Sequence, residues 1–157
     1  MKNKTEIKYA LGFFMMTLFW MAMERLFGLH STYIEKHATY TNLYAIPSVL
    51  IYVFALLEKR KSYNGIITYG QAFKCGLLMT VYITLLSPVS QYITSVYITP
   101  HYFENAINYT VTTGKMTQDA AIAEFNLNNY LMYSVIGSIV MGLFTTGLVS
   151  LFVKRSR

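Results

Sequence analysis

Four apolar segments divide the chain, and each is long enough, or nearly long enough, to cross a lipid bilayer. A spanning α-helix needs about 20 predominantly apolar residues. The segments occupy approximately residues 9–29, 40–57, 72–98 and 130–153. We therefore predict an all-α protein, with a single membrane domain over residues 1–157 and four transmembrane helices packed as a bundle.

The composition agrees with a membrane location. Hydrophobic residues make up 54% of the chain and charged residues 13%, whereas soluble domains carry about 25% charged residues. A soluble domain of 157 residues leaves much of its surface exposed to water and has too small an interior for this much apolar surface. The lipid bilayer is therefore the expected surrounding, and the 14 tyrosines suit its two interfaces with water.

The lysine and arginine residues alternate between the two sides of the predicted bundle. The N-terminus, the connection at 58–74 and the C-terminus carry Lys2, Lys4, Lys8, Lys59, Arg60, Lys61, Lys74, Lys154, Arg155 and Arg157. The connections at 30–40 and 99–129 carry only Lys36 and Lys115. Because basic loops stay in the cytoplasm, both termini are predicted to be cytoplasmic. The net charge of +6 is then explained by anionic lipid headgroups, and nucleic acid is not an expected partner.

The segment 99–129 is the largest part predicted to lie outside the membrane. Thr99 and Pro100 have the pattern of a helix start, and Gly114 that of a helix end. Thr117 is a second expected N-cap. We expect a short extracytoplasmic two-helix segment between helices three and four, lying against the outer membrane face.

A resemblance to a known family adds to this prediction. It depends on the four-span plan, the stretch Tyr69-Gly70-Gln71-Ala72-Phe73-Lys74 that leads into the third helix, the short outer segment and the basic C-terminus. Together these features resemble the bacterial membrane-protein family called domain of unknown function 4199, found mostly in Bacteroidota. The resemblance covers nearly the whole chain and implies a bacterial inner-membrane location. It brings no agreed activity and no functional residues.

A polar cluster in the outer half of the bundle is the candidate site. Glu24 and Arg25 lie in the first predicted span, where ionisable residues are costly and often functional. Further polar residues at a similar depth are Ser87, Gln91 and Ser134. One interpretation is an entry site for an ion or small ligand. The alternative, which we favour, is a structural role in which the charged pair orients helix one and the others form hydrogen bonds between helices.

A series of small residues at every fourth position marks the fourth span: Ser134, Ser138, Gly142, Thr146 and Ser150. Small residues allow two helix backbones to approach closely. The pattern does not distinguish a contact within the chain from one between copies, and we favour a contact within the chain.

Sequence motifs for catalysis or cofactor binding do not stand out. His30, His37 and His101, with Glu35 and Glu104 nearby, have the residue types of a zinc site but no recognised ligand spacing. We interpret them as scattered interfacial histidines and predict neither a metal nor a cofactor. The chain has no GxSxG, HExxH or phosphate-loop pattern, and we do not expect an enzyme.

Two functional hypotheses follow. The first is a non-enzymatic accessory or assembly subunit that works through helix contacts, with the bilayer and either a second copy or another membrane protein as partner. The second is a small transporter or channel component that uses the outer polar cluster around Glu24. A water-filled cavity that reaches Glu24 would favour the second.

Overall fold

The computed structural model describes residues 4–155 of the chain, so that Lys2 and Arg157 of the predicted basic flanks lie outside the described residues. The fold is all-α. In chain order the helices are α1 (Lys4–Leu26), α2 (Ile34–Tyr40), the 3-10 helix η1 (Thr41–Tyr44), α3 (Ala45–Ser62), α4 (Tyr69–Ile93), the π-helix η2 (Thr94–Ile98), α5 (Tyr102–Thr112), α6 (Gln118–Glu124) and α7 (Leu127–Val153).

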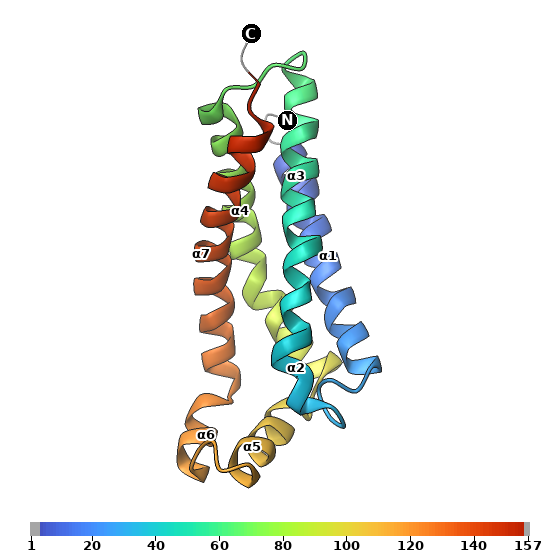
Figure 1. The fold of residues 1–157 in the computed structure, drawn as a ribbon, viewed down its shortest axis with the longest axis vertical. Helices are drawn as coiled ribbons and strands as arrows, with labels where there is room; N and C mark the ends of the chain where they lie inside the picture. Colours follow the sequence, from blue (N-terminus) through green and yellow to red (C-terminus); the bar gives the residue numbers. More distant parts are fainter. Residues whose placement is uncertain (1–3, 156–157) are drawn as a thin grey trace.

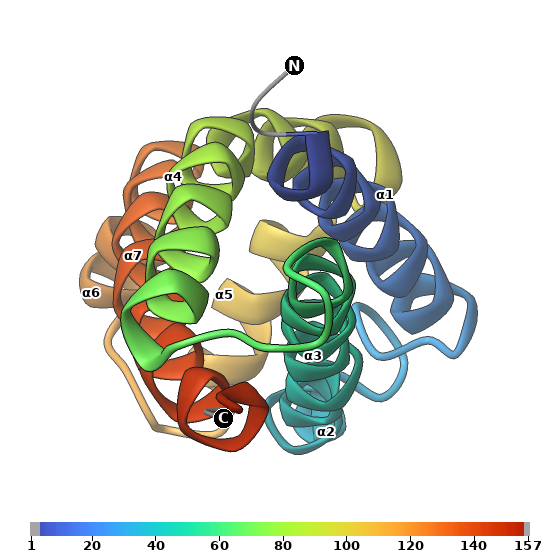
Figure 2. The same cartoon turned by 90° about the horizontal axis from the view of Figure 1, so that it is seen from above.

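Four long helices, α1, α3, α4 and α7, lie side by side, and α4 and α7 make the most extensive contact (Figures 1 and 2). The start of α1, the α3–α4 turn and the end of α7 meet at one end. There, Ile67 and Arg155 exchange two backbone hydrogen bonds of 3.2 and 2.9 Å. The helices α5 and α6 lie at the opposite end (Figure 1).

Within residues 4–155, three helices are long and apolar enough to cross a membrane: Ile34–Ser62, Tyr69–Ile98 and Leu127–Val153. The prediction of four spans is therefore supported for three of them. Helix α1 has 23 residues, but charged residues at both of its ends lower its mean hydropathy.

Local sequence signals explain where α4 and α6 begin. Thr68 and Gln71 form a reciprocal capping box that starts α4. The turn before it depends on Asn64 and Gly65, whose φ angles are +54° and +84°. Thr117 caps α6, as predicted.

The predicted start of the first outer helix at Thr99 is wrong. The helix α5 begins at Tyr102, after His101. The Thr99 hydroxyl donates a 3.1 Å hydrogen bond back to the carbonyl of Thr94, so it completes η2 instead of capping the next helix.

The apolar core lies in the half of the bundle where α1 begins and α7 ends, which we call the packed half. Its buried residues include Leu56, Cys75, Met79, Thr146 and Ser150. The half between this core and α5 has a different interior, described below, and we call it the hollow half.

The small residues of α7 pack against α4 within the chain. A Cβ atom added at Gly142 would lie 2.5 Å from Cγ2 of Thr80 and 3.0 Å from the Tyr52 hydroxyl. One added at Gly76 of α4 would lie 2.6 Å from Cγ2 of Thr146. Thr146 and Ser150 are fully buried. The close approach of the two backbones therefore depends on glycine in both helices.

Candidate functional site: a cavity and a buried carboxylate cluster

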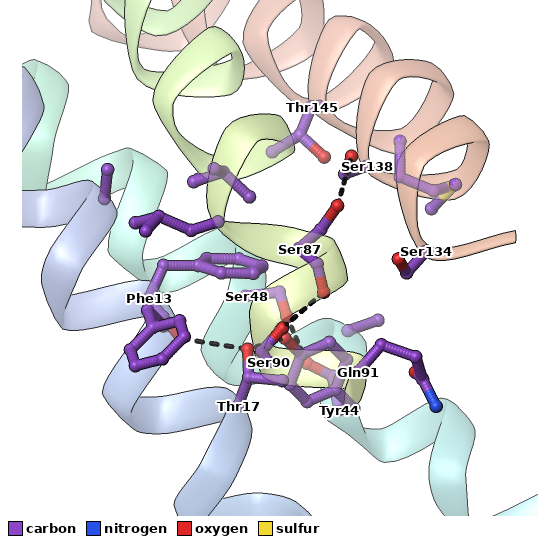
Figure 3. Close-up of a pocket in the computed structure, with 18 of the residues that line it drawn as sticks. Phe13, Thr17, Tyr44, Ser48, Ser87, Ser90, Gln91, Ser134, Ser138 and Thr145 are labelled. Atoms are coloured by element: carbon purple, nitrogen blue, oxygen red, sulfur yellow. Dashed lines mark hydrogen bonds between the residues drawn. The ribbon is translucent and has the colours of Figure 1, made fainter. Parts of the chain in front are cut away.

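The hollow half contains a cavity of about 400 Å³. All four long helices line it, together with η1 (Figure 3). The polar side chains on its wall are Thr17, Asn42, Tyr44, Ser48, Tyr52, Ser87, Ser90, Gln91, Tyr133, Ser134, Ser138, Thr145 and Thr41. The remaining wall is formed mainly by Phe, Met, Leu, Ile and Val side chains. Among the described residues, no charged side chain lines this cavity.

The cavity lies beside a proline-containing part of α4 and small residues of α7. Pro88 has no backbone N–H, so the carbonyl of Thr84 loses its helical partner. The Ser87 hydroxyl donates to that carbonyl at 3.0 Å. Across the cavity, Gly137 has no atom within 4 Å of an added Cβ. The space that a large side chain would fill therefore remains open.

Most wall hydroxyl groups donate to partners within the protein. Thr17 and Tyr44 share a hydrogen bond of 2.5 Å between α1 and η1. The Ser48 hydroxyl donates to the carbonyl of Tyr44 at 2.7 Å. The Ser138 hydroxyl donates to the hydroxyl of Thr84 at 3.0 Å and lies 3.5 Å from that of Ser87, the contact drawn in Figure 3. Their oxygens retain acceptor capacity. The wall is thus mainly apolar, with neutral hydroxyl groups spaced along it.

The predicted polar residues divide between two places. Ser87, Gln91 and Ser134 line the cavity. Glu24 and Arg25 do not. Arg25 is exposed, and its guanidinium donates to the carbonyl of Ile98 at 2.5 Å, at the end of η2. The structure therefore does not bring the five residues into one site.

Glu24 forms a separate buried cluster at the end of α1. One carboxylate oxygen, Oε1, accepts a 2.6 Å hydrogen bond from the Trp20 indole. The other, Oε2, lies 3.1 Å from Nε2 of His30 and 3.5 Å from Nε2 of His37. Glu24 and His30 are buried, and the side chain of His37 is 20% exposed. Two histidines thus face Oε2 of Glu24, while the Trp20 indole binds the other carboxylate oxygen.

The ring of Tyr102, from α5, packs against both histidines. Its centroid lies 5.3 Å from that of His30 and 5.2 Å from that of His37. Its hydroxyl is 3.5 Å from Nδ1 of His37. Burial raises the pKa of Tyr102, so the phenol is neutral at physiological pH. The Asn105 amide also donates to the carbonyl of His30 at 2.9 Å, which fastens this turn to α5.

The third histidine lies elsewhere. His101 is exposed and 3.6 Å from Glu104. The zinc-type residues identified in the sequence are the three histidines with Glu35 and Glu104, and they do not include Glu24. The sequence signal for this contact is Gly28, because glycine readily adopts the positive φ of a chain reversal. Gly28 has a φ of +73° and reverses the chain after α1. The histidines that follow it therefore pack against Glu24 of that helix.

A known family matches the chain over residues 8–155; its description is "Protein of unknown function (DUF4199)". No curated protein and no solved structure matches the chain.

Proposed function

The chain belongs to the DUF4199 family, and from its structure we propose that it is a four-helix protein of the bacterial inner membrane that binds a small, uncharged, lipid-like molecule in its cavity. The observation that carries this proposal is the cavity of about 400 Å³ inside the hollow half.

The outward face of α1 supports the fourth span. Leu11, Met15 and Phe19 are exposed large apolar residues at intervals of four along this helix, and residues at this spacing share one helix face. An exposed apolar stripe beside three apolar helices suits contact with lipid. Helix α1 therefore completes the membrane bundle, although its charged ends lower its hydropathy.

The orientation follows from the basic residues. Lys59, Arg60 and Lys61 lie in the last turn of α3, and Arg155 follows α7. Both helix ends lie at the end of the bundle where α1 begins (Figure 1). Both termini are then cytoplasmic, and the hollow half and α5 face the periplasm. A cytoplasm-active reporter fused after Arg157 is expected to be active. Activity of a periplasm-active reporter at the same position would contradict this orientation.

The chemistry of the wall selects the ligand class. Pockets for small molecules typically occupy about 300–1,000 Å³ and combine an apolar lining with few polar groups. Here the polar groups are neutral, and burying an unpaired charge among them is costly. A ligand with an apolar body and one or two hydrogen-bonding groups, such as a lipid, suits this wall.

Mass spectrometry of lipids that co-purify with the protein in mild detergent tests the proposal. In Gly137→Leu, the new side chain enters the cavity and should displace the bound molecule. Gly12→Leu is the matched control, because Gly12 is a helical glycine that does not line the cavity and also has no atom within 4 Å of an added Cβ. Wild type and Gly12→Leu should carry the same species, and Gly137→Leu should lose it. Equal recovery from all three proteins would refute the proposal.

The two functions considered from sequence have less support. The small residues of α7 are the basis for an accessory subunit, but three of them, Gly142, Thr146 and Ser150, pack within the chain. Transport through Glu24 would require the cavity to reach that carboxylate, which does not line it. We propose no enzymatic activity.

A further inference from the structure

The cluster of Glu24, His30 and His37 has the composition of a metal site. One ligand atom from each residue lies within 4.8 Å of the other two. Imidazole nitrogen and carboxylate oxygen are the ligands of zinc sites and of other divalent transition-metal sites. Mg²⁺ and Ca²⁺ prefer oxygen ligands alone. The donor set therefore selects a transition metal over these two cations.

The distances also suit this chemistry. Ligand atoms at 2.0–2.1 Å from a tetrahedral zinc ion are about 3.3 Å from one another. The carboxylate oxygen Oε2 of Glu24 lies 3.1 Å from Nε2 of His30 and 3.5 Å from Nε2 of His37. No ligand pair is more than 4.8 Å apart, so closing the set around an ion needs a movement of at most about 1.5 Å.

Groups behind the ligands hold them in place. The Trp20 indole engages Oε1 of Glu24, which leaves Oε2 directed to the histidines. The Tyr102 hydroxyl lies at hydrogen-bonding distance from Nδ1 of His37, the nitrogen on the far side of that ring. Metal-binding proteins orient carboxylate and histidine ligands by such outer contacts.

The other nitrogen of His30, Nδ1, is buried and has no hydrogen-bond partner among the described residues. It lies across the imidazole ring from Nε2, so it does not itself contribute to the ligand set.

We propose that Glu24, His30 and His37 bind one divalent transition-metal ion of the zinc class at the α5 end of the bundle. Three protein ligands leave a fourth position for water or another ligand. The ion joins the end of α1 to the turn that follows it and to α2, with α5 packed against the ligands. This site is separate from the cavity, so it does not depend on the cavity ligand.

Zinc titration of the purified, chelator-treated full chain in detergent tests the proposal by calorimetry. Wild type is expected to bind one Zn²⁺ per chain, and excess Mg²⁺ should not compete. Glu24→Gln and His37→Ala should weaken binding on the order of 100-fold or more, beyond the roughly 10–100-fold typical of losing an outer contact. The matched control is His101→Ala, because His101 is exposed and outside the cluster. It should bind as wild type does.

Cobalt provides a measurement that needs no variant. The only tryptophan, Trp20, contacts Glu24, so bound Co²⁺ should quench its fluorescence and show the absorption bands of four-coordinate cobalt. Folding of each variant is verified by circular dichroism. The proposal is refuted if wild type shows neither saturable zinc binding nor these cobalt signals. It is equally refuted if correctly folded Glu24→Gln and His37→Ala bind zinc as wild type does.

Discussion

The packed half and the hollow half are formed by the same four helices but have different interiors. In the packed half and at its border with the cavity, Gly76 and Gly142 allow α4 and α7 to approach until Thr80 and Thr146 fill the space between them. In the hollow half, Pro88 removes one backbone hydrogen bond from α4, and Gly137 of α7 faces open space. A small residue therefore gives a tightly packed helix contact only where a side chain of the opposite helix occupies the space beside it.

Each half also buries one carboxylate from α1, with different partners. Glu6, in the packed half, lies 2.7 Å from the ammonium group of Lys59. Glu24, in the hollow half, faces two histidines. Lysine has no lone pair for a metal while it is protonated, whereas neutral imidazole is a common metal ligand. The pair of Glu6 and Lys59 therefore suits a structural ion pair. The group of Glu24 with two histidines suits the binding of a metal ion.

The largest effect is expected from Lys59→Met, which leaves Glu6 buried without its cation. Removing one partner of a buried pair costs about 3–5 kcal/mol. The Lys59 side chain is 16% exposed, so we expect about 3 kcal/mol, the lower end of this range. The free energy of unfolding is measured by SDS titration in mixed micelles, followed by Trp20 fluorescence.

Two controls test the cause of this loss. The double variant Glu6→Gln/Lys59→Met should regain most of it, because no buried charge remains. Lys8→Met breaks the exposed pair with Glu58 and should have little effect. If Lys59→Met and Lys8→Met are equally stable, the packed half does not depend on its buried pair.

An intermediate effect is expected from Gly142→Leu, since the new side chain meets Thr80 and Tyr52 at 2.5–3.0 Å. Overpacking of this kind typically costs about 1–3 kcal/mol. Gly137→Leu is the matched control, because it makes the same change in the same helix where an added Cβ contacts nothing within 4 Å. Equal stability of the two variants in the SDS titration would remove the distinction between the halves.

The smallest effect is expected from Ser87→Ala, which leaves the Thr84 carbonyl without the hydrogen bond that compensates for Pro88. Hydrogen bonds in membrane bundles contribute about 0.6 kcal/mol on average. Ser134→Ala serves as the control, because the Leu131 carbonyl to which Ser134 donates belongs to a helix without proline. An equal loss of unfolding free energy in both variants would show that the missing backbone hydrogen bond at Pro88 does not increase the contribution of Ser87 to stability.

Much of the fold could be predicted from the sequence because its signals are local. Apolar segments of membrane length correspond to Ile34–Ser62, Tyr69–Ile98 and Leu127–Val153. The turn at Asn64-Gly65 and the cap at Thr117 depend on residues within one or two turns of the chain. Local signals can still mislead. The Thr99 hydroxyl donates to the carbonyl of Thr94 in the preceding π-helix and does not cap the following helix.

The sequence by itself thus predicted three long apolar helices, the turn at Asn64-Gly65 and the grouping of basic residues at alternate connections. It also placed Ser87, Gln91 and Ser134 at similar depth, and they line one cavity. It did not predict α2, which lies within the predicted connection at 30–40. Only the tertiary structure decided that Glu24 belongs outside that cavity, and that Tyr102, far along the chain, packs against His30 and His37. The physical reason is that periodicity and caps act within a single helix. The rotation of each helix, which decides which side chains meet, is set by packing against its neighbours.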